Sequence, residues 1–318
     1  MATAQQAQEE RPQDEGRMEQ RLYGSADFNR IVAEVGCGYT TRQPLFKEIE
    51  GKTGRKLISY VALVGHPASV ISPDDVVPFS SLLTDLDGFE GLDVMMHSGG
   101  GNADVAEKLI MMCRTFTGEK PLRVIVPNYA KSAATLFALG TDCIVMGYTS
   151  ELGPIDPQIP QLRPGGQVVF TSAKSFLDSL EKVKKEAEET NALNPALIPI
   201  LSNVDLAFLE EVRRSIDRSR EFAVKWLKKH MLSGRPRAAR GVADKLLNVE
   251  KYLSHGMVID AAEAERIGLE VERRAPQDDL WSTIWELYCR SELFLRQTQH
   301  VKLFETDSSS TGFRAVPG

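Results

Sequence analysis

The feature that most constrains the fold is an alternation of short apolar runs with helix-like segments, which begins near residue 57. The apolar runs include "LISYVALVG", "GLDVMMHS", "PLRVIVP" and "TDCIVMG", and segments with helical spacing of apolar residues lie between them. Strands that alternate with helices form right-handed crossovers, which place the strands in a mostly parallel sheet covered on both faces. The sequence therefore predicts an α/β fold.

Beyond Ser172 the sequence changes to long charged helical segments, and we expect a helical insertion over about 172–250. A C-terminal helix is expected over 276–300, with Trp281 and Trp285 beside its apolar side. This helix and the longest helix of the insertion offer more apolar surface than one subunit readily hides. The sequence therefore predicts a homo-oligomer.

Both ends of the chain are polar. Residues 1–25 are rich in Gln, Glu and Arg and poor in aliphatic side chains, so burial cannot offset the entropy of ordering them, and the tail over 301–318 reads likewise. We expect both segments to be disordered, with the main domain over 26–275. The N-terminal segment lacks the apolar core of a secretory signal, and no run of about 18 apolar residues is present. A cytoplasmic protein without a membrane anchor of its own is expected.

Composition excludes several function classes. The formal net charge of −6 argues against nucleic acid as the main partner. The four cysteines are far apart in apolar contexts and have neither zinc-ligand nor disulfide-framework spacing, so we expect reduced thiols and no metal. The glycine-rich "HSGGGNADV" is neither a Walker A motif nor a dinucleotide fingerprint. No cofactor is predicted.

Two short stretches carry the chemistry. Gly99, Gly100 and Gly101 follow one predicted strand and open a helix, so their amides can converge on a negatively charged oxygen. Ser132 follows the next strand, at the start of the next helix. In a parallel sheet both lie at the carboxyl edge, where they can meet. Ser132 is either a helix cap or a nucleophile, and the neighbouring glycines favour the nucleophile.

Three blocks, "HSGGGNADVAEKL", "VPNYAKSAATLFALGTDCIVMGYTSELGPIDPQ" and "HGMVIDAAEAERIGL", resemble the ClpP/crotonase superfamily. The resemblance is closest to the serine dehydrogenase proteinase family of signal-peptide-peptidase-A-like serine proteases and covers roughly 57–272. It implies a ClpP-like spiral of ββα units, a protease domain over 26–275, Ser132 as nucleophile, and an oligomer. The expected oxyanion hole combines Gly100 or Gly101 with the N–H of Ala133. The sequence departs from the family at Gly99, where a proline is usual, and at Ala133-Ala134, where Ala-Gly or Gly-Gly is typical.

A serine also needs a base that accepts its proton. Lys174 is the main candidate, because Ser–Lys dyads occur in related enzymes at a broadly similar spacing, although a solvated surface lysine is an equal alternative. His255 is the rival, with an unperturbed pKa suited to the role but a position that favours substrate or subunit contacts. His97 could orient the glycine turn, and Asp156 could orient the base or cap its own turn.

These residues predict an ATP-independent serine peptidase that acts on peptide or protein substrates. Two other functions remain open on the same architecture. A crotonase-type acyl-CoA enzyme would use the same oxyanion hole for a thioester enolate, but Ser132 at the nucleophile position counts against it. A non-catalytic oligomeric scaffold would use the long charged helices as its interaction surface.

Overall fold

The computed structural model describes residues 38–88, 90–162, 166–202, 204–248 and 257–315. Its centre is a seven-stranded sheet with the strand order β11-β10-β1-β2-β3-β5-β9. Neighbours from β1 to β9 in this order are parallel, and only β10 and β11 pair antiparallel, which confirms the predicted α/β fold with a mostly parallel sheet. The parallel strands are β1 (Lys56–Ala62), β2 (Leu92–His97), β3 (Leu122–Val126), β5 (Cys143–Met146) and β9 (Val271–Arg273).

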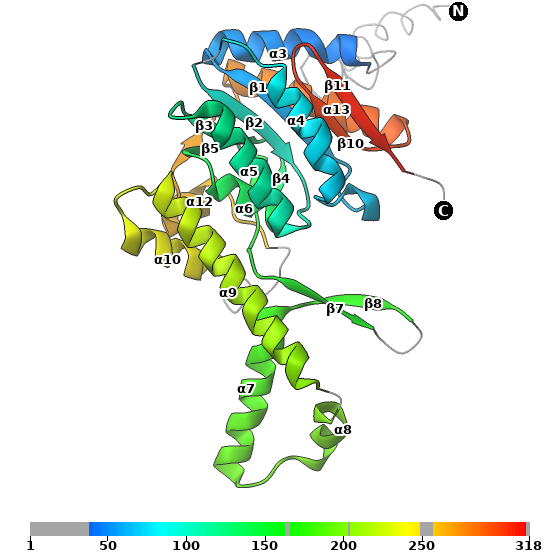
Figure 1. Cartoon of the computed structure of the whole chain (residues 1–318), viewed down its shortest axis with the longest axis vertical. Coiled ribbons are helices and arrows are strands. Elements are labelled where there is room, and N and C mark those ends of the chain that lie inside the picture. The colour runs from blue at the N-terminus through cyan, green and yellow to red at the C-terminus, as the bar shows by residue number, and fades with distance from the viewer. Residues whose placement is uncertain (1–37, 89, 163–165, 203, 249–256, 316–318) are drawn as a thin grey trace, which may run out of the picture.

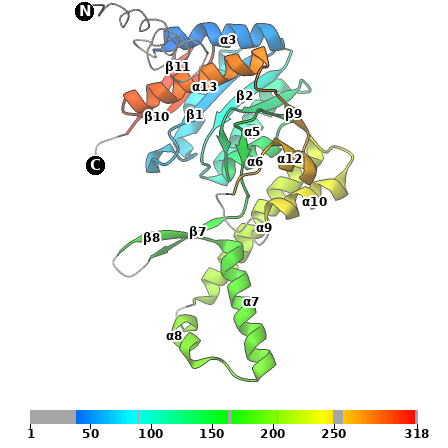
Figure 2. The ribbon, with the colours of Figure 1, turned by 180° about the vertical axis from the view of Figure 1, so that it is seen from behind.

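Helices cover both faces of this sheet (Figures 1 and 2). One face carries α4 (Val76–Thr84), α5 (Ala103–Thr117), α6 (Ala133–Leu139), α9 (Leu206–Lys229), α10 (Pro236–Leu246) and α12 (Ala261–Ile267). The opposite face carries α3 (Tyr39–Thr53) and α13 (Asp279–Gln297). In β1, Tyr60 faces the first layer and Leu57 and Val61 face the second, so the strand is buried on both sides. Such double burial explains why these strands read as nearly continuous apolar runs.

The C-terminal tail differs from the sequence-based expectation of disorder over 301–318. Residues that were expected to be disordered form β10 (His300–Glu305) and β11 (Ser310–Arg314), which extend the sheet beyond β1. In β10 the side chains of Val301, Leu303 and Phe304 are buried, so the strand contributes to the core. The expected disorder of 1–25 falls outside the described residues.

An arm of helices and a hairpin projects from the sheet domain (Figure 1). It contains β7 (Gln158–Leu162), β8 (Val168–Ser172), α7 (Ala173–Thr190), α8 (Ile198–Leu201) and the first half of α9. Phe176 of α7 packs edge-on against Phe208 of α9, with ring centroids 5.8 Å apart. Large apolar side chains nevertheless stay exposed on the arm, including Phe170 at 66% and Leu206 at 77%. None of the helices in the described ranges is both long and apolar enough to span a bilayer.

The apolar face of α13 is not the exposed surface that the sequence suggested. Trp281, Ile284, Leu287 and Tyr288 are at most 1% exposed and pack on the sheet within the same subunit. A side chain on Gly147 of the sheet domain would overlap the Trp281 ring, so the helix and the sheet are closely apposed there. The buried side of α13 is therefore not available to a second subunit, whereas the arm exposes Phe170 and Leu206.

Candidate active site

The glycine turn joins β2 to α5 and is held against a neighbouring segment of backbone. Ile71 donates its N–H to the Gly100 carbonyl oxygen (2.8 Å), and the Asn102 N–H donates to the Ile71 carbonyl oxygen (2.9 Å). Gly100 and Gly101 have φ values of 101° and 146°, a region that residues with a side chain rarely adopt. A methyl group on Gly101 would lie 2.5 Å from the Ile71 backbone. Only glycine fits these two positions without displacing the neighbouring backbone.

Ser132 has an unusual backbone conformation. It lies between β4 (Tyr129–Ala130) and α6, with φ 52° and ψ −118°. A non-glycine residue in such a region is strained by about 1–3 kcal/mol and is held there by its surroundings. Ser132 occupies the N-cap position of α6, but its side chain makes no capping hydrogen bond to any described residue. The hydroxyl is therefore not used as a helix cap, and the side chain is half-buried rather than enclosed.

The glycine turn and Ser132 lie in contact, as the strand order predicts. A methyl group on Gly100 would come within 2.8 Å of Ser132 Cβ and 3.1 Å of the Ala133 nitrogen. The Gly100 N–H donates to Ser98 Oγ (3.1 Å). By contrast, the N–H groups of Gly101 and Ala133 have no hydrogen-bond partner among the described residues.

A cavity of about 730 Å³ opens beside Ser132. Its wall comes from separate parts of the chain: the segment before α4, the glycine turn, the start of α6, the hairpin and α9. The lining residues are Val70, Ile71, Ser72, Pro73, Gly99, Gly100, Gly101, Asn102, Ala103, Ser132, Ala133, Leu136, Ile155, Pro157, Gln158, Phe170 and Ser219. Most of the side chains among them are apolar, so the cavity favours an apolar group next to the serine.

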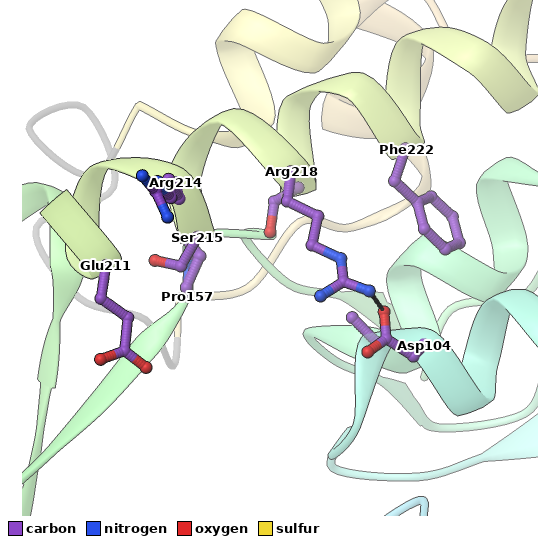
Figure 3. A pocket seen from close by; sticks show the side chains of 9 residues that line it. Asp104, Pro157, Glu211, Arg214, Ser215, Arg218 and Phe222 are labelled. Carbon is purple, nitrogen blue, oxygen red and sulfur yellow. Dashed lines mark hydrogen bonds and ion pairs between the residues drawn. The ribbon is translucent and has the colours of Figure 1, made fainter.

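A second cavity of about 300 Å³ adjoins the first and shares Ala103, Pro157 and Ser219 with it. Figure 3 shows its charged wall on α9, where Arg218 forms an ion pair with Asp104 at the start of α5. The two cavities are therefore adjacent, and α9 contributes to the wall of both.

Lys174 lies in the first turn of α7 and is not among the residues that line the serine cavity. Its side chain is 40% exposed and its amine forms an ion pair with Asp178, one turn further along the helix. The preceding residue, Ala173, donates its N–H to the Pro157 carbonyl oxygen at the cavity wall (2.8 Å). The lysine backbone is thus near the cavity, while its amine is held by Asp178.

His97 is buried beneath the opposite face of the sheet. Its ring stacks on Tyr129 with centroids 5.4 Å apart and meets the Tyr288 ring edge-on at 4.8 Å. Its Nδ1 accepts the Tyr129 N–H (3.1 Å), which fixes the strand that leads to Ser132. Burial lowers the pKa of His97 to about 4. Nearby charges have smaller effects: Glu292 raises the pKa and Arg296 lowers it. The histidine is 1% exposed and outside the cavity lining, so its geometry is that of a support for β4.

Two candidates for the base and its orientation remain, Asp156 and His255, and only Asp156 lies within the described residues. Asp156 is buried and accepts a hydrogen bond from Gln158 Nε2 (2.9 Å), so it orders the turn that enters the hairpin. His255 falls outside the described residues. In the described ranges, no group of three or more His, Cys, Asp or Glu side chains is arranged to hold a metal ion.

Sequence reasoning missed several residues of the cavity wall. Ile71, Phe170 and Ser219 come from three separate segments, and no local motif signals their convergence. Ser98 was also missed, although it precedes the glycine run and accepts the Gly100 N–H. The position of Ser98 directly after β2 and before the glycine run was the one available signal for it.

Comparisons with known proteins show the family to which the chain belongs. The family model for ClpP-like SDH-type serine proteinases matches residues 87–309. Two uncharacterised proteins of Methanocaldococcus jannaschii, MJ0137 and MJ1495, are 27% and 26% identical over 62% and 58% of this chain. The matches cover 58% and 53% of those proteins, so the chain spans little more than half the length of the curated relatives it matches.

Solved structures resemble the chain more distantly. A 1510-N membrane-bound stomatin-specific protease is 15% identical, with 65% of this chain and 94% of that chain covered and a TM-score of 0.35. ClpP1 from Listeria monocytogenes is 11% identical over 74% and 97%, and an enoyl CoA isomerase from M. smegmatis is 18% identical over 76% and 86%, both with a TM-score of 0.35. The family model matches more than half of this chain, and the chain belongs to the ClpP-like SDH-type serine proteinases.

Proposed function

We propose that the chain is a serine peptidase in which Ser132 Oγ attacks the carbonyl carbon of a substrate peptide bond. The new C–O bond gives a tetrahedral oxyanion, which collapses to an acyl-enzyme as the C–N bond breaks and the amine leaves with a proton. Water then hydrolyses the ester. The observation that carries this proposal is the contact between Gly100 and a strained, uncapped Ser132 at the edge of a cavity.

The oxyanion is assigned to the N–H groups of Gly101 and Ala133. In a parallel β-bridge, one residue has both of its sequence neighbours hydrogen-bonded to the partner strand. The N–H of that residue points away from the partner strand. Gly100 and Asn102 both bond Ile71, so the Gly101 N–H points away from Ile71. Ala133 contributes the free amide of the first residue of α6, where the helix dipole favours negative charge. Gly100 allows the turn to approach Ser132 closely, but it supplies no N–H to the oxyanion, because Ser98 Oγ accepts that N–H.

Lys174 is the base that we propose, with His255 as the alternative. To accept the Ser132 proton, the Lys174 amine has to leave Asp178 and turn into the cavity. The anchoring of Ala173 to Pro157 supports this role, because it holds the lysine backbone at the cavity wall. Substrate that displaces the lysine from Asp178 would therefore assemble the dyad.

We also propose that the enzyme uses no nucleotide and works in the cytoplasm as a homo-oligomer. The second cavity extends the first, so an extended peptide fits better than a small ester. Exposed apolar side chains on the arm, such as Leu206 and Ile198, supply a surface for a second copy. Light scattering at micromolar concentration tests the assembly, and a monomer would contradict it.

A fluorophosphonate probe tests the nucleophile. Wild-type protein should be labelled covalently at Ser132 without added ATP, and Ser132→Ala should not be labelled. Ser219→Ala is the matched control, because Ser219 lines the same cavity from α9 and should not affect which residue reacts. A folded wild-type protein that resists the probe would favour the non-catalytic scaffold.

Three variants test the base. Lys174→Ala should abolish labelling, while His255→Ala should reduce it less. Asp178→Asn removes the negative charge that holds the Lys174 amine. If Lys174 is the base, this variant should be labelled faster than wild type. If His255→Ala is the inactive variant and Asp178→Asn has no effect, the role passes to His255.

A further inference from the structure

A buried polar cluster lies behind the glycine turn. Its centre is Asp75, which is 0% exposed and accepts hydrogen bonds from the Tyr60 hydroxyl (2.9 Å) and the Ser72 N–H (2.9 Å). Lys302 of β10 is 3% exposed and donates to Asp75 Oδ1 (2.6 Å) and to Ser72 Oγ (3.0 Å). The buried charge of Asp75 is therefore balanced by a lysine from the far end of the chain.

Ser98 holds the glycine turn on its other side. Burial and the Asp75 charge raise the pKa of Tyr60 well above its usual value, and Ser98 lowers it by a smaller amount. Ser98 Oγ accepts the Gly100 N–H (3.1 Å), and the Ser98 carbonyl oxygen accepts the Lys131 N–H (3.0 Å), next to Ser132. Ser98 therefore connects the glycine turn to the segment that carries the serine.

The same cluster fixes the facing wall of the cavity. Ser72 lines the cavity beside Ile71, the residue that bonds the backbone of the glycine turn on its outer side. Asp75 holds the Ser72 N–H, and the adjacent Ile71 bonds the glycine turn, so one buried carboxylate supports both the wall and the turn. Buried networks of this kind rigidify a structure when every member has its partners.

We propose that Lys302, Asp75, Tyr60 and Ser98 position the glycine turn for the reaction at Ser132, so that the Gly101 amide faces the substrate carbonyl. Ser98 holds the Gly100 N–H, and the other three hold Ser72, whose neighbour Ile71 bonds Gly100 and Asn102. The proposal rests on the proposed role of the glycine turn. None of the four residues lines the cavity, so they act through Gly100 and Ser72 rather than on substrate. They are positioning residues.

Tyr60→Phe tests the proposal, because it removes the hydroxyl that donates to Asp75 (2.9 Å). The matched control is Tyr288→Phe, which removes a buried hydroxyl bonded to Asn128 Nδ2 (2.9 Å) on the other face of the sheet. Both variants should lose similar thermal stability. Only Tyr60→Phe should slow the maximal rate of fluorophosphonate labelling, by about tenfold or more, with little change in probe affinity.

Hydrogen exchange provides a readout that does not depend on activity. The peptide that spans residues 95–105 should exchange faster in Tyr60→Phe than in wild type, while Tyr288→Phe leaves it unchanged. Ser98→Ala should reproduce the effect, with Ser59→Ala as its control, since Ser59 Oγ is buried without a partner among the described residues. Unchanged exchange in both Tyr60→Phe and Ser98→Ala would overturn the positioning role. Wild-type protein that exchanges as expected but is not labelled would instead refute the peptidase.

Discussion

Gly100 packs against Ser132 so closely that a single added methyl group would lie 2.8 Å from the serine Cβ. The two residues come from separate strand ends, and β2 and β3 are parallel neighbours in the sheet. Their contact places the amides of the glycine turn beside Ser132, the only serine among the described residues that has a positive φ.

Gly100→Ala should destabilise the fold by about 1–3 kcal/mol and abolish labelling at Ser132. The added methyl group meets the Lys131 carbonyl oxygen at 2.7 Å, and the residue has a φ of 101°. Gly99→Ala is the stability control, because its nearest neighbour is the Val64 side chain at 3.6 Å. Urea denaturation measures both variants, and an equal loss in the two would contradict the prediction.

Ser132→Gly should be more stable than wild type by about 1 kcal/mol, although it cannot react with the probe. The gain comes from relief of the strained backbone at φ 52° and ψ −118°. Asn191→Gly is the control: Asn191 has φ 50° and ψ 25°, in the left-handed region that asparagine tolerates, so its gain should be smaller. A destabilised Ser132→Gly would show that the serine side chain is needed for packing.

His97 should make the fold sensitive to acid. Its pKa is lowered by burial to about 4, so the unfolded chain takes up a proton near pH 6.5 while the folded chain resists until about pH 4. The free energy of unfolding should therefore fall as the pH drops through this window, by about 3 kcal/mol in total. Thermal unfolding between pH 4 and 7.5 checks this.

His97→Gln should flatten that dependence. The pKa of His230 is also lowered to about 4, first by burial and then by the Arg114 charge. His230 therefore contributes to the pH dependence of the wild-type protein, and only the difference between His97→Gln and wild type reports on His97. Identical pH dependence in both proteins would mean that His97 does not resist protonation.

Lys302→Met should cost about 3–5 kcal/mol, because it leaves the buried Asp75 charge without its cation. Pairing it with Asp75→Asn should restore part of the loss. Arg296→Met is the control, since Arg296 is 58% exposed in its pair with Glu292 and should cost no more than about 1 kcal/mol. Denaturant midpoints of these variants measure the losses of stability. Similar losses for the buried Lys302–Asp75 pair and the exposed Arg296–Glu292 pair would show that burial is not the cause.

Local patterns were enough to predict the parallel sheet and the meeting of the glycine turn with Ser132. Both depend on the order of strands and helices, which hydrophobic periodicity reports directly. The conformation of Ser132 was not predictable, because a φ of 52° is imposed by surrounding packing rather than by the local sequence.

Contacts between distant segments account for the rest. "HVKLFE" forms a strand because it pairs with β1, a partner far away in sequence, and its lysine is buried only because Asp75 is there to meet it. In the same way, the position of Lys174 along the chain did not reveal that its amine is paired with Asp178. Sequence spacing fixes where a backbone passes, whereas the direction of a long flexible side chain depends on its neighbours in space.

The antiparallel pairing of β10 with β1 also affects biosynthesis. β1 is made early, but β10, the neighbour on its outer edge, is made only after all the parallel strands of the sheet. Until then the nascent chain displays an open strand edge, which is a template for unwanted pairing with other chains. Synthesis of β10, rather than completion of the parallel strands, is the step that protects this edge.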